Sequence, residues 1–445
     1  MKMKRRKDMV LFPLCQGKYR KSQILFILDG ILINAAVTIT NNVFLSGYMV
    51  TLKADDFLVG ILNSSPTWSL LISLFSFLIF ERMERRKTLL VVMNIVSRIL
   101  ICSVVYLPFL IKDGTTLLYL TAIMTITGNL IWSIFGVGVM VWMISLLPNN
   151  QDKNRYIYLR MFFLRISFTV FSLAMGLVLD LFNKSLTGFV VVFSVSLLLS
   201  AIDAVLLMNT YEPANKVDKT AKTFDMDCFL EPIRNKEYRK YLIFVFCLYF
   251  CLCLSSSFTP LFQIRYLELD YSFLSVINTI SYITMVLSTQ IWNRVELKMG
   301  LPFVLSLTAV FMASEFFFYG FMTQKTVFLL LITPFLAGIG NSGFNVATVN
   351  YRYSIIPEDS HKTIYEGWYG AVMGLSALLG PTAGNLIRHM LPSFQNDVFQ
   401  FSGFQIMYLV SFASALAVIY LMFSRPFKPL SVRVARKMSG GRGPL

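Results

Sequence analysis

Long apolar stretches alternate with short charged segments along almost the whole chain. A helix needs about 20 apolar residues to cross the hydrocarbon core of a bilayer, and a helix satisfies its own backbone hydrogen bonds in lipid. We therefore expect each stretch to be a transmembrane helix. There are twelve, at about 22–51, 57–80, 88–111, 115–147, 157–181, 187–208, 241–264, 272–292, 302–322, 326–351, 363–391 and 402–423.

The overall composition supports a membrane protein. Of the 445 residues, 56% are apolar and 14% are charged, whereas soluble domains carry about 25% charged residues. A water-soluble enzyme is therefore excluded. The chain contains no phosphate-binding loop of the ATPase type, and its cysteines lack the paired spacing of a zinc site. We expect no enzymatic activity, no cofactor and no metal.

The basic residues are divided unevenly between alternate loops. If the N-terminus is inside, 32 of the 40 Lys and Arg residues fall on the inner side and six on the outer side. This bias predicts that both termini are cytoplasmic and that the chain lies in the cell membrane as a multi-pass protein. The basic tails then set the topology and contact anionic lipid, so the net charge of +16 does not require nucleic-acid binding.

A short loop pattern occurs twice, which indicates two related halves. Ser145 to Tyr156 and Ser354 to Tyr365 both read S-x-x-P-x4-K-x2-Y, each between the fourth and fifth helix of a six-helix group. Repeated halves are typical of transporters. We predict a basic tail (1–21), an N-terminal six-helix bundle (22–208), a cytoplasmic linker (209–240), a C-terminal bundle (241–423) and a second basic tail (424–445).

The loop after the second helix carries a recognisable motif. The stretch FLIFERMERRK matches G-x3-D-R-x-G-R-R-K at its acid and its basic positions, which include Glu81, Arg82, Arg85 and Arg86. With this motif and twelve helices, the chain resembles the major facilitator superfamily of twelve-helix bacterial type. The resemblance implies an all-α fold of two six-helix bundles, with Glu81 latching the N-terminal end of the eleventh helix. Alternatively, the cluster only sets the topology.

The resemblance also implies a substrate cavity formed by the first, fourth, seventh and tenth helices. Each of these helices has polar residues at helical spacing. Buried amides can instead pair across helices, so a structural role is the alternative. The few charges favour a neutral or weakly charged substrate. The candidate cavity residues are Asn34, Thr38, Asn41, Asn129, Trp132, Gln263, Asn341 and Asn345.

Charged residues inside a membrane are costly and usually functional. Asp29 and Arg165 lie at similar depths in the first and fifth helices, and we expect an ion pair between them, either as a static brace or as part of a gate. We expect Arg98 to reach the headgroups. Glu315 lies near mid-membrane in the ninth helix. It is a candidate proton carrier, or else a protonated acid bonded to a neighbouring helix.

These features favour a secondary transporter that moves a small molecule by alternating access and is coupled to an ion, with protons the first candidate. Uptake and efflux both agree with the residues. The alternative is a non-transporting membrane sensor or scaffold with a transporter fold. The short loops leave little room for an oligomer contact, so we expect a monomer in the lipid bilayer.

Overall fold

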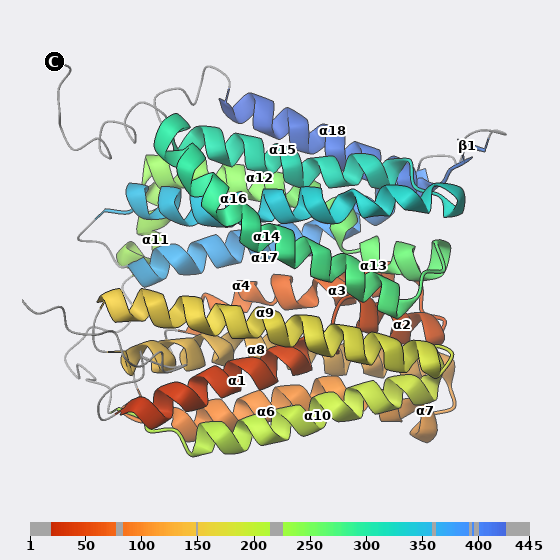
Figure 1. Ribbon diagram of the computed structural model, residues 1–445, viewed down its shortest axis with the longest axis horizontal. Helices are drawn as coiled ribbons and strands as arrows, with labels where there is room; N and C mark the ends of the chain where they lie inside the picture. The colour runs from red at the N-terminus through yellow and green to blue at the C-terminus, as the bar shows by residue number, and fades with distance from the viewer. Residues whose placement is uncertain are drawn as a thin grey trace, which may run out of the picture.

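The computed structural model describes residues 19–76, 83–147, 150–213, 226–357, 362–390, 394–395 and 400–423. Apolar segments of the first half form a set of helices that lies on one side of the molecule in Figure 1. In chain order these are α1 (Arg20–Thr38), α2 (Val43–Thr51), α3 (Asp56–Trp68), α4 (Leu70–Ser73), α6 (Lys87–Ser103), η2 (Val104–Tyr106), α7 (Leu107–Leu110), α8 (Gly114–Ser145), α9 (Asn150–Leu181) and α10 (Leu186–Met208).

The second half forms the other side of the molecule. Its elements are α11 (Met226–Arg234), α12 (Lys236–Ser256), α13 (Thr259–Leu261), η3 (Phe262–Tyr266), α14 (Tyr271–Met299), α15 (Leu301–Gly320), η4 (Gln324–Leu331), α16 (Thr333–Ile355), α17 (Lys362–Met390) and α18 (Gly403–Phe423). A short antiparallel pair, β1 (Phe394–Gln395) and β2 (Gln400–Phe401), precedes α18. The predicted linker extends to residue 240, but α12 already begins at Lys236.

Eleven helical segments within the described part of the chain are long and apolar enough to cross a membrane. The predicted second span, 57–80, is not among them. Pro66 lies inside α3 and cannot donate a backbone hydrogen bond, and the helix is interrupted at Ser69 before α4 begins. The first span is also broken, at Asn42, whose φ of 49° is outside the helical region.

The helices pack first within each half and then across a central interface. In the first half, α1 contacts α9 and α10, and α6 contacts α8. In the second half, α16 lies against α14 and α15, while α12 lies against α17 and α18. Two long contacts join the halves: α3 and α4 pack on α17, and α9 packs on α14. The interface between the halves is therefore formed by α3–α4 and α9 from the first half and by α17 and α14 from the second half.

The described chain begins and ends at the same end of the bundle (Figure 1). We call the opposite end, which carries the loops 52–55, 182–185 and 267–270, the distal end. The short helices α2 and α13 and the π-helical turn η3 meet there. Single π turns often occur at functional sites, and this one contains both Gln263 and Arg265.

Candidate functional site: a central cavity and the contacts that close it

A cavity of about 430 Å³ lies between the two halves. Residues from α1, α9, α14, α15, α16 and the segment from α12 to η3 line it. Hydroxyl and amide groups predominate, because each contributing helix directs a polar stripe inward. The polar lining comprises Thr38, Asn41, Asn42, Ser172, Ser256, Thr259, Gln263, Ser275, Asn278, Ser281, Tyr282, Glu315, Tyr319, Thr333 and Asn341.

Four of the predicted cavity residues meet in this lining. Thr38 and Asn41 come from the first helix, Gln263 from the seventh and Asn341 from the tenth. Gln263 Nε2 donates to the Tyr319 hydroxyl at 2.7 Å, which holds the amide at the cavity wall. Glu315 also lines the cavity, although the ninth helix is not one of the four helices expected to form it.

The other four predicted cavity residues lie elsewhere. Asn34 and Trp132 line a second cavity of about 280 Å³ inside the first half, and Asn34 Nδ2 donates to the Leu164 carbonyl at 2.8 Å. Asn129 is buried and donates to the Ser65 hydroxyl at 2.7 Å, so it joins α8 to α3. Asn345 is exposed and is not among the residues that line either cavity.

The predicted ion pair between Asp29 and Arg165 is wrong. Asp29 pairs with Arg160, whose Nη2 lies 2.9 Å from Asp29 Oδ2, and Arg160 Nε donates to the Phe26 carbonyl at 3.1 Å. Arg165 instead contacts the other half, because its Nη1 lies 3.2 Å from Met285 Sδ and its guanidinium faces the Tyr282 ring. Five residues along a helix turn a side chain by about 140°, which separates the two arginines.

Buried polar atoms surround the second cavity. Arg98 is 1% exposed and stacks on Trp132, with its guanidinium carbon 4.2 Å from the ring centroid. The sequence analysis expected Arg98 to reach the headgroups, and this expectation is wrong because the side chain is buried within the first half. Its Nε and Nη1 atoms, Asn94 Oδ1 and Asp203 Oδ1 have no hydrogen-bond partner within the described part of the protein. Buried polar atoms of this kind are normally satisfied by ordered water.

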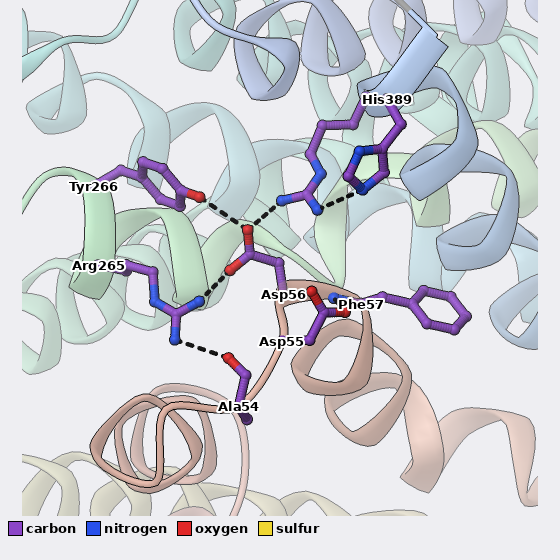
Figure 2. A network of polar contacts seen from close by, with 8 residues as sticks. Ala54, Asp55, Asp56, Phe57, Arg265, Tyr266 and His389 are labelled. Atoms are coloured by element: carbon purple, nitrogen blue, oxygen red, sulfur yellow. Dashed lines mark hydrogen bonds and ion pairs between the residues drawn. The ribbon is translucent and has the colours of Figure 1, made fainter.

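One carboxylate joins the halves at the distal end (Figure 2). Asp56, at the start of α3, accepts hydrogen bonds from the guanidinium groups of Arg265 and Arg388 and from the Tyr266 hydroxyl at 2.8 Å. Arg265 also donates to the Ala54 carbonyl at 2.9 Å. All three donors belong to the second half, so Asp56 ties α3 to η3 and α17. We call Asp56, Arg265, Tyr266 and Arg388 the distal latch.

The electrostatics of the distal latch favour an ionised Asp56. Burial alone would raise the pKa of Asp56. The hydrogen bonds from Arg388 and Tyr266, together with the positive charges of Arg388 and Arg265, outweigh burial and hold that pKa below its ordinary value. Asp56 is therefore ionised near neutral pH.

A second carboxylate joins α9 to α14. Asp180 accepts from the backbone nitrogen of Tyr271 at 3.0 Å and from that of Ser272 at 2.8 Å. These are free N–H groups in the first turn of α14, where the helix dipole also favours a negative charge. Lys184 adds an ion pair to Asp270 at 2.8 Å. Asp180 and the Lys184–Asp270 ion pair therefore hold α9 against α14 at the distal end, where Asp56 holds α3 against α17.

The halves touch closely beneath these carboxylates. A Cβ atom added to Gly47 would lie 1.9 Å from the Tyr271 hydroxyl, so glycine permits the observed approach of the Tyr271 side chain to α2. Nearer the cavity, the Ser172 and Ser275 hydroxyl oxygens are 2.9 Å apart, and Ser275 also donates to the Ser172 carbonyl. This serine pair forms part of the distal wall of the cavity.

Of the loop motif, Glu81 and Arg82 lie outside the described residues. Arg85 and Arg86 are described, and the Arg86 and Lys87 backbone nitrogens donate to the Glu212 carboxylate. Glu212 therefore caps the N-terminus of α6. The latch between Glu81 and the eleventh helix stays a prediction.

Sequence reasoning missed several residues of this site. Arg265 and Arg388 entered the sequence analysis only in the count of basic residues on the outer side, and Arg160 only in the count on the inner side. Asp56 was not considered. A usable signal was present at the distal end. Asp56 and Asp180 each lie at or next to the end of a predicted apolar span, where a partly buried acid needs a partner.

Comparison with known proteins agrees with this fold. The MFS_1 like family matches residues 66–400, whereas no curated protein matches the chain in sequence. Similar solved structures include the nucleoside transporter NupG, with 16% identity, a TM-score of 0.66 and coverage of 91% of this chain and 98% of that one. The D-xylose-proton symporter has 12% identity, a TM-score of 0.67 and coverage of 91% and 97%.

A bacterial homologue of the iron transporter ferroportin, in an inward-facing state, is also similar, with 15% identity, a TM-score of 0.66 and coverage of 92% of this chain and 100% of that one. The fold and the family match together define a multi-pass membrane transporter of the major facilitator type. The chain belongs to the MFS_1 like family, which confirms the resemblance noted from its motif.

Proposed function

We propose that the protein is a secondary active transporter that moves a small polar molecule by alternating access through the central cavity, coupled to a proton gradient. It has twelve transmembrane helices in two six-helix bundles, with both termini cytoplasmic and the distal end outside. It acts as a monomer in the cell membrane, without enzymatic chemistry or a cofactor. The solute and the direction of transport are separate questions.

One observation carries this proposal: the contacts that close the distal end all join the two halves. The Asp56 latch, the Asp180 cap and the Ser172–Ser275 pair each have one partner in either half. Contacts of this kind can break together when one bundle rocks against the other. A static structural brace would have no need to lie between a polar cavity and one end of the molecule.

The moving units are the two predicted bundles, 22–208 and 241–423. The Asp29–Arg160 ion pair lies wholly within the first bundle and joins α1 to α9. We therefore assign it as a brace that keeps that bundle rigid, in place of the gating alternative. The short helix α11, next to α12 and α17, belongs to the linker that connects the bundles.

Coupling is assigned to Glu315. Among the described residues that line the cavity it is the acidic one, so it can exchange a proton with whichever side the cavity faces. Replacement of Glu315 by Gln should abolish gradient-driven accumulation but preserve solute exchange at saturating solute concentration. Intact accumulation in that variant would remove Glu315 from the coupling mechanism.

The proposal is tested by binding and flux together. The purified protein is screened for thermal stabilisation by sugars, nucleosides, amino acids, organic acids and amines. A ligand at 100 times its dissociation constant stabilises the folded state by about 2.7 kcal/mol. A hit should enter proteoliposomes, and both binding and flux should weaken in Asn341→Ala. Binding without flux in a well-reconstituted protein would favour the sensor alternative.

A further inference from the structure

The charge of the cavity lining is unbalanced. Glu315 is a carboxylic acid, and none of the other described lining residues carries a formal charge. No hydrogen bond or ion pair to Glu315 occurs within the described part of the protein. An uncompensated carboxylate in a membrane interior is costly, so an occupant of the cavity that brings a positive charge would be stabilised there.

Neighbouring groups do not supply that charge. The phenols of Tyr319, on the same helix, and Tyr408, on α18, are the titratable groups that interact electrostatically with Glu315. The Tyr319 hydroxyl already accepts from Gln263. Arg165 is the arginine that contacts a lining residue, but its guanidinium is directed at Tyr282 and Met285 across the α9–α14 contact. The positive charge must come from outside the protein.

Aromatic rings line the same cavity. Phe168 and Tyr282 approach with their ring centroids 4.4 Å apart, one from each half, and Phe44, Phe316 and Tyr319 complete the set. The face of an aromatic ring attracts a cation, most strongly when water is excluded. A carboxylate combined with aromatic faces and uncharged amides is the chemistry that recognises an organic ammonium ion.

We propose that the solute carried in the central cavity is a small organic cation, an amine whose positively charged nitrogen pairs with Glu315 while the rings and amides hold its body. This inference rests on the proposed transport function and replaces the neutral or weakly charged solute favoured by the sequence. A cavity of about 430 Å³ is in the usual range for binding one small molecule.

The test uses pairs of probes that differ in charge but hardly in shape. Tyramine is compared with 4-(2-hydroxyethyl)phenol, and choline with 3,3-dimethylbutan-1-ol, by thermal unfolding and calorimetry of the full-length protein at pH 7. At least one cation should bind at least tenfold more tightly than its neutral partner. Glu315→Gln should remove that preference, whereas Glu296→Gln, an acid at the far end of α14 that contacts Asn350, should keep it.

Equal or tighter binding of the neutral partners, absence of binding by both cations, or a preference that survives in Glu315→Gln would overturn the proposal. The wild-type comparison of paired probes needs no variant, so it remains decisive even if Glu315→Gln does not fold. Measurements of flux distinguish a failure of the proposed solute class from a failure of the proposed transport function. A neutral solute that is transported while the cations are not refutes only the solute class. Cation binding that depends on Glu315 without any flux refutes only transport.

Discussion

Replacement of Asp56 by Asn should open the distal end. The amide keeps the shape of the side chain but loses its charge, so it leaves the Arg265 and Arg388 guanidinium groups close together without their shared counter-ion. Both arginines belong to the second half. The substitution therefore removes the attraction between α3 and these two guanidinium groups, which stabilises the closed arrangement of the halves and is absent from an open one.

The free energy that the closed distal state should lose in Asp56→Asn can be estimated from the burial and the geometry of the ion pairs. Removing one partner of a buried ion pair costs about 3–5 kcal/mol. The Asp56 and Arg388 side chains are each 10% exposed but that of Arg265 is 27% exposed, and the amide retains part of the hydrogen bonding, so solvent screening reduces the cost. We expect the closed distal state to lose about 2 kcal/mol, which is a change of about 30-fold in the equilibrium between closed and open forms.

The assay is a distance measurement across the distal end. Spin labels are placed at two exposed residues of different halves, Lys112 on the loop before α8 and Lys325 in η4, in a protein whose native cysteines are replaced by serine. The matched control is Asp55→Asn. Asp55 is the adjacent acid and caps α3 through the Phe57 backbone nitrogen at 3.0 Å, without contact to the second half (Figure 2).

Double electron–electron resonance should show a longer distance population in Asp56→Asn that is weak or absent in the parent and in Asp55→Asn. An unchanged distribution in Asp56→Asn would refute the role of the latch. An equal change in both variants would mean that damage to α3, and not loss of the inter-half ion pairs, causes the opening.

Three further predictions concern charges near the interface. In Asp180→Asn the same labels should report a smaller opening, because a carboxylate at a helix N-terminus contributes about 0.3–1 kcal/mol; an effect larger than that of Asp56→Asn would contradict this ranking. Because the pKa of Asp56 is held below its ordinary value of 3.8, its contribution to closure is complete above that value and lost only as the pH falls through the lowered pKa; opening of the distal end between pH 7.5 and 5.5 would show that another group controls it. Arg160→Gln should destabilise the protein by about 3 kcal/mol, because it leaves the buried Asp29 carboxylate without its ion-pair partner. Arg165→Gln should cost less than about 1 kcal/mol. A lower melting temperature for Arg165→Gln than for Arg160→Gln would instead favour the Asp29–Arg165 pair expected from the sequence.

The sequence predicts the helices well because their length is fixed by the bilayer. Ten of the twelve predicted spans coincide with unbroken or nearly continuous helical segments, and the remaining two differ for local reasons. The break at Asn42 depends on how the short helices pack at the distal end, whereas the interruption after α3 follows Pro66, which a pattern of apolar residues alone does not register. Likewise, the π turn that places Gln263 and Arg265 on different partners has no periodic signal.

The site was predictable as a set of polar stripes but not as a set of partners. Gln263 and Asn341 meet in one cavity because the helices that carry them meet there. Asn129 has the same spacing signal, yet it is satisfied by Ser65 inside the first half. Helix rotation decides such cases, and it also decides that Asp29 meets Arg160 and not Arg165. A hydrophobic pattern in lipid reports rotation poorly, since lipid-facing and helix-facing residues are both apolar.

The central claim is that solute passes through the cavity as the halves rock apart at the distal end. Ser172→Cys combined with Ser275→Cys places two thiols where hydroxyl oxygens now lie 2.9 Å apart, so a disulfide there should hold the halves together. Flux of the first solute found to stabilise the protein is measured in proteoliposomes before oxidation, after it and after reduction, with each single variant as a control. Flux that stops on oxidation and returns on reduction in the double variant alone is the predicted result. Undiminished flux through the fully cross-linked protein would contradict alternating access through this cavity.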